Sequence, residues 1–104
     1  MATRKLAILL STPPENRNRA TVVSLAREAS RQGVTTYLYL IDDGVLNLDD
    51  LEICALAEAG VVLFACAYSA YRRGISPKND TVTFAGLVVL SDLIRGCNKF
   101  VAFN

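Results

Sequence analysis

The sequence predicts an α/β domain in which a five-stranded parallel sheet is covered by helices on both faces. Five apolar runs of strand length alternate with segments of helical spacing, an order typical of parallel sheets. The runs are apolar at successive positions instead of at every second one, which indicates strands buried on both faces. With 104 residues, of which 52% are hydrophobic, the chain is long enough for one such domain, expected to span residues 1–104.

The five predicted strands are rich in aliphatic, aromatic and β-branched residues, which favour extended backbone. They cover residues 5–11, 35–41, 61–65, 81–85 and 99–103. The first is followed by Pro13 and Pro14, which exclude a helix or a central strand there. The second stops at the turn signal Asp42-Asp43-Gly44.

Four predicted helices follow the first four strands, and their ends carry recognisable signals. We expect Asn18 to be the N-cap of the first helix, and Asp49 and Glu52 to form a capping box that opens the second. The third follows Cys66, and the fourth covers residues 87–95. A glycine, which is favoured at helix ends, follows each of the four helices: Gly33, Gly60, Gly74 and Gly96.

Composition excludes several classes of chemistry. The chain has no histidine, so Ser-His-Asp or Cys-His catalytic groups and His-ligated metal sites cannot be built from its own residues. Eleven Lys and Arg against ten Asp and Glu leave no basic stripe of the kind that nucleic acids require. No apolar stretch approaches membrane-spanning length. We therefore expect a soluble cytoplasmic protein with no metal or other cofactor and no direct contact with membrane or nucleic acid.

Cys66 is the first candidate for chemistry, because it lies where the third strand runs into a helix. The free N–H groups of a helix start favour a thiolate there, so we expect Cys66 to react at a lower pH than an ordinary thiol. The alternative is that Cys66 is simply a small hydrophobe at the end of a buried strand. The other two cysteines are weaker candidates. Cys54 lies on an apolar helical stripe, and Cys97 lies at the opposite edge of the sheet.

Arg72 and Arg73 follow Cys66 in the same predicted helix. Arg73 lies about 10 Å further along the helix axis, at about 1.5 Å per residue, which argues against a direct ion pair with Cys66 in the same chain. The two cations either complement the helix end or bind an anionic sulfur donor or the cysteine of a neighbouring subunit. Tyr68 and Tyr71 are expected to line a pocket or an interface.

The sequence contains two weaker candidate sites. Asp42 and Asp43 suggest the acidic pair of a receiver domain, but such a domain has that pair after its first strand, where this chain has Ser11. The loop from Ser11 to Asn18 precedes a helix and is a candidate anion cradle. It contains no glycine, so the phosphate-loop reading is weak.

The run CAYSAYRRG, from Cys66 to Gly74, resembles the active segment of the DsrE/TusD group of sulfur-relay proteins. Asp43-Gly44-Val45 and residues 81–103 are similar to that family as well. The resemblance implies a single DsrE-like domain with strand order 4-3-2-1-5, assembled as a homotrimer or hexamer. It also implies that Cys66 accepts sulfane sulfur as a persulfide and passes it to another sulfur-relay protein with a reactive cysteine.

The leading hypothesis is therefore a sulfur carrier or sulfurtransferase in which Cys66 is the catalytic residue. Arg72, Arg73 and Tyr68 are assigned to the binding of substrate or partner. Thiol exchange depends on the thiolate and its access, so it needs no histidine. The alternatives are a non-catalytic assembly or regulatory subunit of a DsrE-like oligomer, and a nucleotide- or anion-binding module that uses the Ser11 loop.

Overall fold

The computed structural model describes residues 3–78 and 80–104 and contains one five-stranded parallel sheet. The order of its strands is β4-β3-β2-β1-β5, which confirms both the predicted fold class and the predicted order. The strands are β1 (Lys5–Leu10), β2 (Thr35–Leu40), β3 (Val62–Cys66), β4 (Val82–Ala85) and β5 (Lys99–Phe103). The central strands β1, β2 and β3 contain the buried residues of the sheet, whereas the edge strands β4 and β5 keep solvent exposure, so the prediction of burial on both faces is wrong for the two edge strands.

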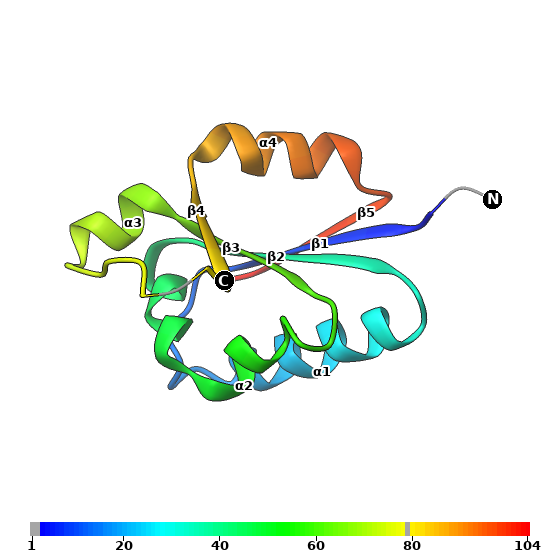
Figure 1. Cartoon of the computed structure of the whole chain (residues 1–104), viewed down its shortest axis with the longest axis horizontal. Helices are drawn as coiled ribbons and strands as arrows, with labels where there is room; N and C mark the ends of the chain where they lie inside the picture. The colour runs from blue at the N-terminus through cyan, green and yellow to red at the C-terminus, as the bar shows by residue number, and fades with distance from the viewer. Residues whose placement is uncertain (1–2, 79) are drawn as a thin grey trace.

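Four α-helices form the outer two layers. They are α1 (Asn18–Arg31), α2 (Leu51–Ala55), α3 (Ala67–Arg72) and α4 (Leu87–Gly96). Figure 1 shows α1 and α2 below the sheet and α3 and α4 above it. None of the helices within residues 3–78 and 80–104 is both long and apolar enough to cross a lipid bilayer.

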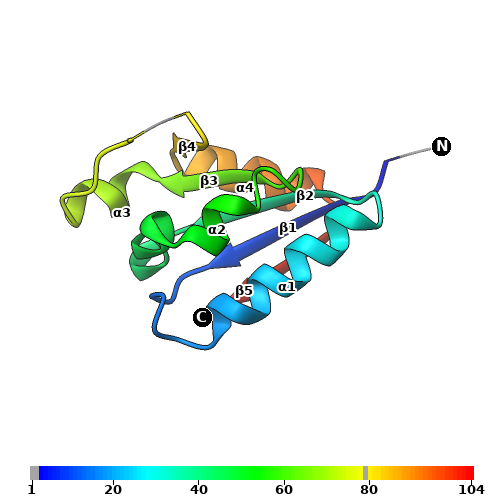
Figure 2. The same ribbon diagram turned by 60° about the horizontal axis from the view of Figure 1, so that its bottom comes forward.

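The main core lies between the sheet and the pair α1 and α2. Sheet residues such as Ile8, Leu38 and Leu63 pack there against Val22 of α1 and Ile53 of α2. Figure 2 shows α1 running along this face with α2 beside it. The opposite face is less completely covered, since every residue of α4 keeps some exposure to solvent.

A 3-10 helix, η1 (Asp42–Asp49), replaces the predicted turn and short connection after β2. Its first turn passes directly over the end of β1. A Cβ atom at Gly44 would overlap the Leu10 carbonyl oxygen, so only glycine permits this close approach. The local sequence contains a turn signal, but the close approach depends on β1 and lies outside any local pattern.

The predicted N-cap residues of α1 and α2 were each wrong by one position. Asp50, not Asp49, is the N-cap of α2, since its carboxylate accepts hydrogen bonds from the N–H groups of Glu52 at 3.0 Å and Ile53 at 3.1 Å. Asn18 is the first residue of α1 instead of its N-cap, and the Asn18 N–H donates to the Asn16 side chain at 2.9 Å.

Three of the four glycines that were predicted to follow a helix do so. Gly33, Gly60 and Gly74 adopt φ values of +84°, +95° and +68°, which glycine favours. Gly96 instead is the last residue of α4. Strand β3 extends one residue further than predicted and ends on Cys66 itself, while α3 ends at Arg72, so Arg73 lies just beyond the helix.

Candidate functional site

Cys66 is both the last residue of β3 and the N-cap of α3. Its Sγ accepts a hydrogen bond from the Ser69 N–H at 3.4 Å, so the sulfur occupies the place of a capping oxygen. The residue is only 4% exposed. Cys66 therefore lies at the carboxyl edge of the sheet, in contact with the start of a helix, as its place in the sequence predicts.

Ser69 joins the Cys66 segment to η1. Its hydroxyl oxygen accepts a hydrogen bond from the Asp42 N–H at 3.0 Å. Asp42 adopts a φ of +52°, a left-handed conformation that Asp tolerates better than most residues. Figures 1 and 2 place α3 and the segment after β2 at the same end of the sheet. Sequence reasoning missed Ser69, because nothing in its neighbourhood marks it as more than a helix residue.

Arg73 and Arg72 have different surroundings. Arg73 donates to the Asp43 carboxylate through Nε at 3.1 Å and Nη2 at 2.9 Å, and through Nη1 to the Ser69 carbonyl at 3.1 Å. Arg72 instead lies over Tyr68, with Nη1 2.9 Å from the hydroxyl and the guanidinium carbon 5.8 Å from the ring centroid. Arg73 thus fastens η1 to the end of α3, while Arg72 and Tyr68 form a cation–π pair on the surface.

A shallow depression of about 370 Å³ brings the predicted binding residues together. It is lined by Asp42, Tyr68, Ser69, Arg72 and Arg73. Cys66 connects to this depression through Ser69, whose N–H bonds to the sulfur. The three residues assigned to substrate or partner binding therefore share one surface next to the thiol.

Tyr39 also belongs to the surroundings of Cys66, although its place in β2 gave no such signal. The side chain is 1% exposed, and its hydroxyl donates to the Gly86 carbonyl at 3.0 Å, with the Ala85 carbonyl at 3.3 Å. Burial raises the pKa of Tyr39 to about 12, and the charge of an ionised Cys66 and a hydrogen bond with Cys66 add to this. The phenol therefore stays protonated beside the thiol.

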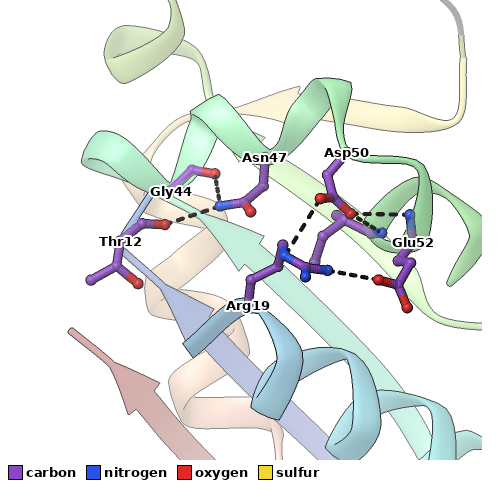
Figure 3. A network of polar contacts seen from close by, with 7 residues as sticks. Thr12, Arg19, Gly44, Asn47, Asp50 and Glu52 are labelled. Carbon is purple, nitrogen blue, oxygen red and sulfur yellow. Dashed lines mark hydrogen bonds and ion pairs between the residues drawn. The ribbon is translucent and has the colours of Figure 1, made fainter. Parts of the chain in front are cut away.

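A polar network beneath η1 holds it in place (Figure 3). Asn47 is fully buried, and its side-chain amide donates to the carbonyls of Thr12 at 3.0 Å and Gly44 at 2.9 Å. Arg19 of α1 pairs with Glu52 at 2.9 Å and with Asp50 at 3.5 Å (Figure 3). Asn47 thus joins η1 to the loop after β1, and Arg19 joins α1 to the start of α2.

The Ser11 loop is occupied by the chain's own carboxyl-terminal segment. The Ser11 N–H donates to the Phe103 carbonyl at 3.0 Å, and its hydroxyl donates to the Asn104 side chain at 2.8 Å. Both donors of Ser11 are therefore used within the chain, which disfavours an anion cradle at this loop.

The other two cysteines lie away from the Cys66 surface. Cys54 is half-buried instead of fully buried in the core, and its thiol donates to the Leu48 carbonyl at 3.2 Å. Cys97 follows α4 at the amino edge of the sheet, opposite Cys66, as predicted. Burial raises the pKa of both thiols, and the neighbouring Asp50 adds to this effect for Cys54.

Comparison with known proteins identifies the family. The family model described as "DsrE/DsrF-like family" matches residues 4–103. The crystal structure of the ychN protein from E. coli is similar over 98% of this chain and 100% of its own, with a TM-score of 0.81 and 20% identity. A conserved protein of unknown function from Bacteroides thetaiotaomicron, BT1422, is similar over 95% of this chain and 94% of its own, with a TM-score of 0.76 and 21% identity. No functionally curated protein matches the sequence significantly. Because the family model spans nearly the whole chain, the protein belongs to the DsrE/DsrF-like family, which is associated with sulfur relay.

Proposed function

We propose that the protein is a sulfur carrier that accepts sulfane sulfur on Cys66 as a persulfide and passes it to a partner protein. The observation that carries the proposal is the position of the Cys66 sulfur, 3.4 Å from the Ser69 N–H at the carboxyl edge of the sheet. Membership of a family associated with sulfur relay supports the same chemistry.

Two thiol exchange steps make up the proposed cycle. In the first, the Cys66 thiolate attacks the terminal sulfur of a donor persulfide, R–S–SH. A Cys66–sulfur bond forms, the sulfur–sulfur bond of the donor breaks, and the donor leaves as the thiolate R–S⁻. In the second, the thiolate of an acceptor cysteine attacks the terminal sulfur of Cys66–S–SH, and Cys66 leaves as a thiolate. The number of sulfur–sulfur bonds is unchanged in both steps, so no oxidant or reductant is required.

Access to the sulfur limits the first step, because Cys66 is only 4% exposed. A small donor reaches the sulfur with a smaller displacement of the surrounding chain than a bulky one does. The shallow depression beside Ser69 offers the approach, and Arg72 at its border supplies a positive charge. We infer that Arg72 and Tyr68 meet the donor or partner, whereas Arg73 mainly holds Asp43.

The partners in this proposal are other relay proteins with reactive cysteines, and the protein itself works as a homotrimer or hexamer in the cytoplasm. Large apolar side chains at the surface support assembly. Tyr68 and Tyr71 are 64% and 79% exposed, and Leu87 and Val88 at the start of α4 are 60% and 74% exposed. Residues of this kind are enriched at protein interfaces.

The same surface supports a second candidate function, a non-catalytic assembly or regulatory subunit in which the Cys66 segment packs at an interface. The two candidates are separated by incubating the wild type and Cys66→Ser with a persulfide donor and measuring intact mass and oligomer size. A sulfur carrier gains the mass of one sulfur atom only when Cys66 is present. An assembly subunit gains none, and Cys66→Ser weakens its oligomer.

A further inference from the structure

The Tyr39 side chain extends from β2 across β3, on the face of the sheet that carries the Cys66 side chain. Tyr39 pairs with Phe64 across β2 and β3, and its ring stacks on the Phe64 ring with 6.3 Å between centroids. Cys66 lies two residues after Phe64 and therefore on the same face of β3. The strand next to β3 on the side away from β2 is β4, and Cys66 pairs there with Ala85. The Tyr39 hydroxyl thus reaches from β2 past β3 to the end of β4, and the Cys66 side chain lies beside that path.

Two carbonyl acceptors share this hydroxyl, which has only one proton to donate. The Gly86 carbonyl lies at 3.0 Å and the Ala85 carbonyl at 3.3 Å, and Cys66, the strand partner of Ala85, has its side chain on the same face of the sheet. Carbonyl groups are the better acceptors while Cys66 is a neutral thiol. A thiolate is charged, and charge-assisted hydrogen bonds are roughly twice as strong as neutral ones.

We propose that Tyr39 is the hydrogen-bond donor to the ionised sulfur of Cys66. Its O–H turns from the Gly86 carbonyl to the sulfur when Cys66 loses its proton. The proton stays on the Tyr39 oxygen throughout and only changes its acceptor. The Tyr39 O–H from β2 and the Ser69 N–H from α3 then supply the sulfur with two hydrogen-bond donors.

Charged groups on the neighbouring elements are mostly engaged with one another. η1 contributes Asp42 and Asp43, and the end of α3 contributes Arg72 and Arg73. Asp43 pairs with Arg73 at 2.9 Å, and Arg72 lies over Tyr68. Asp42 lines the depression together with Tyr68 and Ser69. The residues of β4 and of the α4 start beside Cys66, Ala85 and Gly86, are uncharged. The Tyr39 hydroxyl, in contrast, reaches the end of β4, where Ala85 pairs with Cys66.

The inference has distinct consequences for the two exchange steps of the proposed function, on which it rests. In loading, a donor to the thiolate raises the thiolate fraction at neutral pH and lowers the nucleophilicity of each thiolate. In release, it stabilises the departing Cys66 thiolate, which speeds departure at every pH. Loss of the hydroxyl therefore slows loading at low pH, leaves loading equal or faster at high pH, and slows release throughout.

The test compares wild type, Tyr39→Phe and the matched control Tyr37→Phe. Tyr37 is two residues earlier on the same face of β2 and stacks on the same Phe64 ring at 6.4 Å. Alkylation of Cys66 is followed across pH by site-resolved mass spectrometry, with Cys54 and Cys97 as internal references. We expect the midpoint for Cys66 to rise by about one pH unit in Tyr39→Phe, which makes alkylation below the midpoint about tenfold slower. Tyr37→Phe is expected to follow the wild type.

A reciprocal measurement does not require the Tyr39→Phe variant to be stable. In Cys66→Ala, nuclear magnetic resonance of the labelled tyrosine rings is expected to show Tyr39 titrating at a lower pH than in wild type, because the thiolate that opposes its ionisation is gone. An unchanged Cys66 profile in folded Tyr39→Phe, or an unchanged Tyr39 titration in Cys66→Ala, overturns the inference. Failure of the wild type to take up sulfur while these shifts are present overturns the sulfur-carrier function and leaves the inference standing.

Discussion

The guanidinium of Arg73 lies 2.9 Å from the Asp43 carboxylate, and this pair joins the end of α3 to the start of η1. Arg73 is therefore already matched by an anion of its own chain. Its neighbour Arg72 lies over the Tyr68 ring at the border of the depression next to Cys66. Two adjacent arginines that look equivalent in the sequence thus have different surroundings, and we propose that Arg72 is the one that meets the donor or partner.

Removal of Arg72 is expected to slow the loading of Cys66 by small anionic sulfur donors. Arg72→Ala should lower the rate several-fold at low ionic strength, and the difference should shrink as salt screens the charge. Uncharged donors should be unaffected. Arg27→Ala is the matched control, since Arg27 is an exposed arginine on α1, on the other face of the sheet. Equal effects on charged and uncharged donors would contradict this role for Arg72.

Substitution of Gly44 should destabilise the fold, because any Cβ atom there overlaps the Leu10 carbonyl. We expect Gly44→Ala to lower the free energy of unfolding by about 3 kcal/mol, through displacement of η1 from β1. The matched control is Gly96→Ala, since a Cβ at Gly96 meets nothing within 4 Å and alanine favours the helix. Chemical denaturation of both variants measures the difference. A Gly44→Ala variant as stable as wild type would rule out the close approach.

The N-cap of α2 can be assigned by a pair of variants. Asp50→Ala removes the acceptor of the Glu52 and Ile53 N–H groups and should cost about 1 kcal/mol of stability. Asp49→Ala removes only an exposed ion pair with Lys78, so its effect should stay below about 0.5 kcal/mol. Denaturant midpoints measured under one set of conditions compare the two. A larger loss of stability in Asp49→Ala than in Asp50→Ala would instead identify Asp49 as the N-cap.

Tyr39 makes stability sensitive to alkaline pH. Its pKa is raised from 10.0 to about 12 in the folded protein, so the unfolded chain loses this proton first. The corresponding stability is fully present below pH 10 and is lost as the pH rises through about 12, with a size of up to about 3 kcal/mol. Denaturation curves between pH 9 and about 12 should therefore fall more steeply for wild type than for Tyr39→Phe. Parallel curves would show that Tyr39 does not titrate differently in the two states.

The sheet could be predicted from the sequence because its determinants are local. Apolar runs such as Lys99–Phe103, and the glycines Gly33, Gly60 and Gly74 that follow the first three helices, act within a few residues of themselves. The position of Cys66 could be predicted for the same reason, since a cysteine between a buried strand and a helix is visible as a pattern. The pairing of Arg73 with Asp43 is different, because it joins residues thirty positions apart.

The surroundings of Cys66 could not be predicted, because they arise from register. Tyr39 reads as an ordinary strand residue until β3 and β4 are placed beside β2, which brings Gly86 within 3.0 Å of its hydroxyl. Ser69 looks like a helix residue until Asp42 adopts its left-handed conformation and donates to it. Gly44 similarly owes its importance to Leu10, on another strand.

Intact-mass analysis after incubation with a persulfide donor decides whether Cys66 carries sulfur. Cys66→Ser and Cys97→Ser are examined in parallel, so that the adduct can be assigned to one thiol. We predict that wild type and Cys97→Ser gain the mass of one sulfur atom, that a reductant removes it, and that Cys66→Ser gains none. A wild type that gains no sulfur, or a Cys66→Ser variant that gains as much as wild type, would contradict the claim.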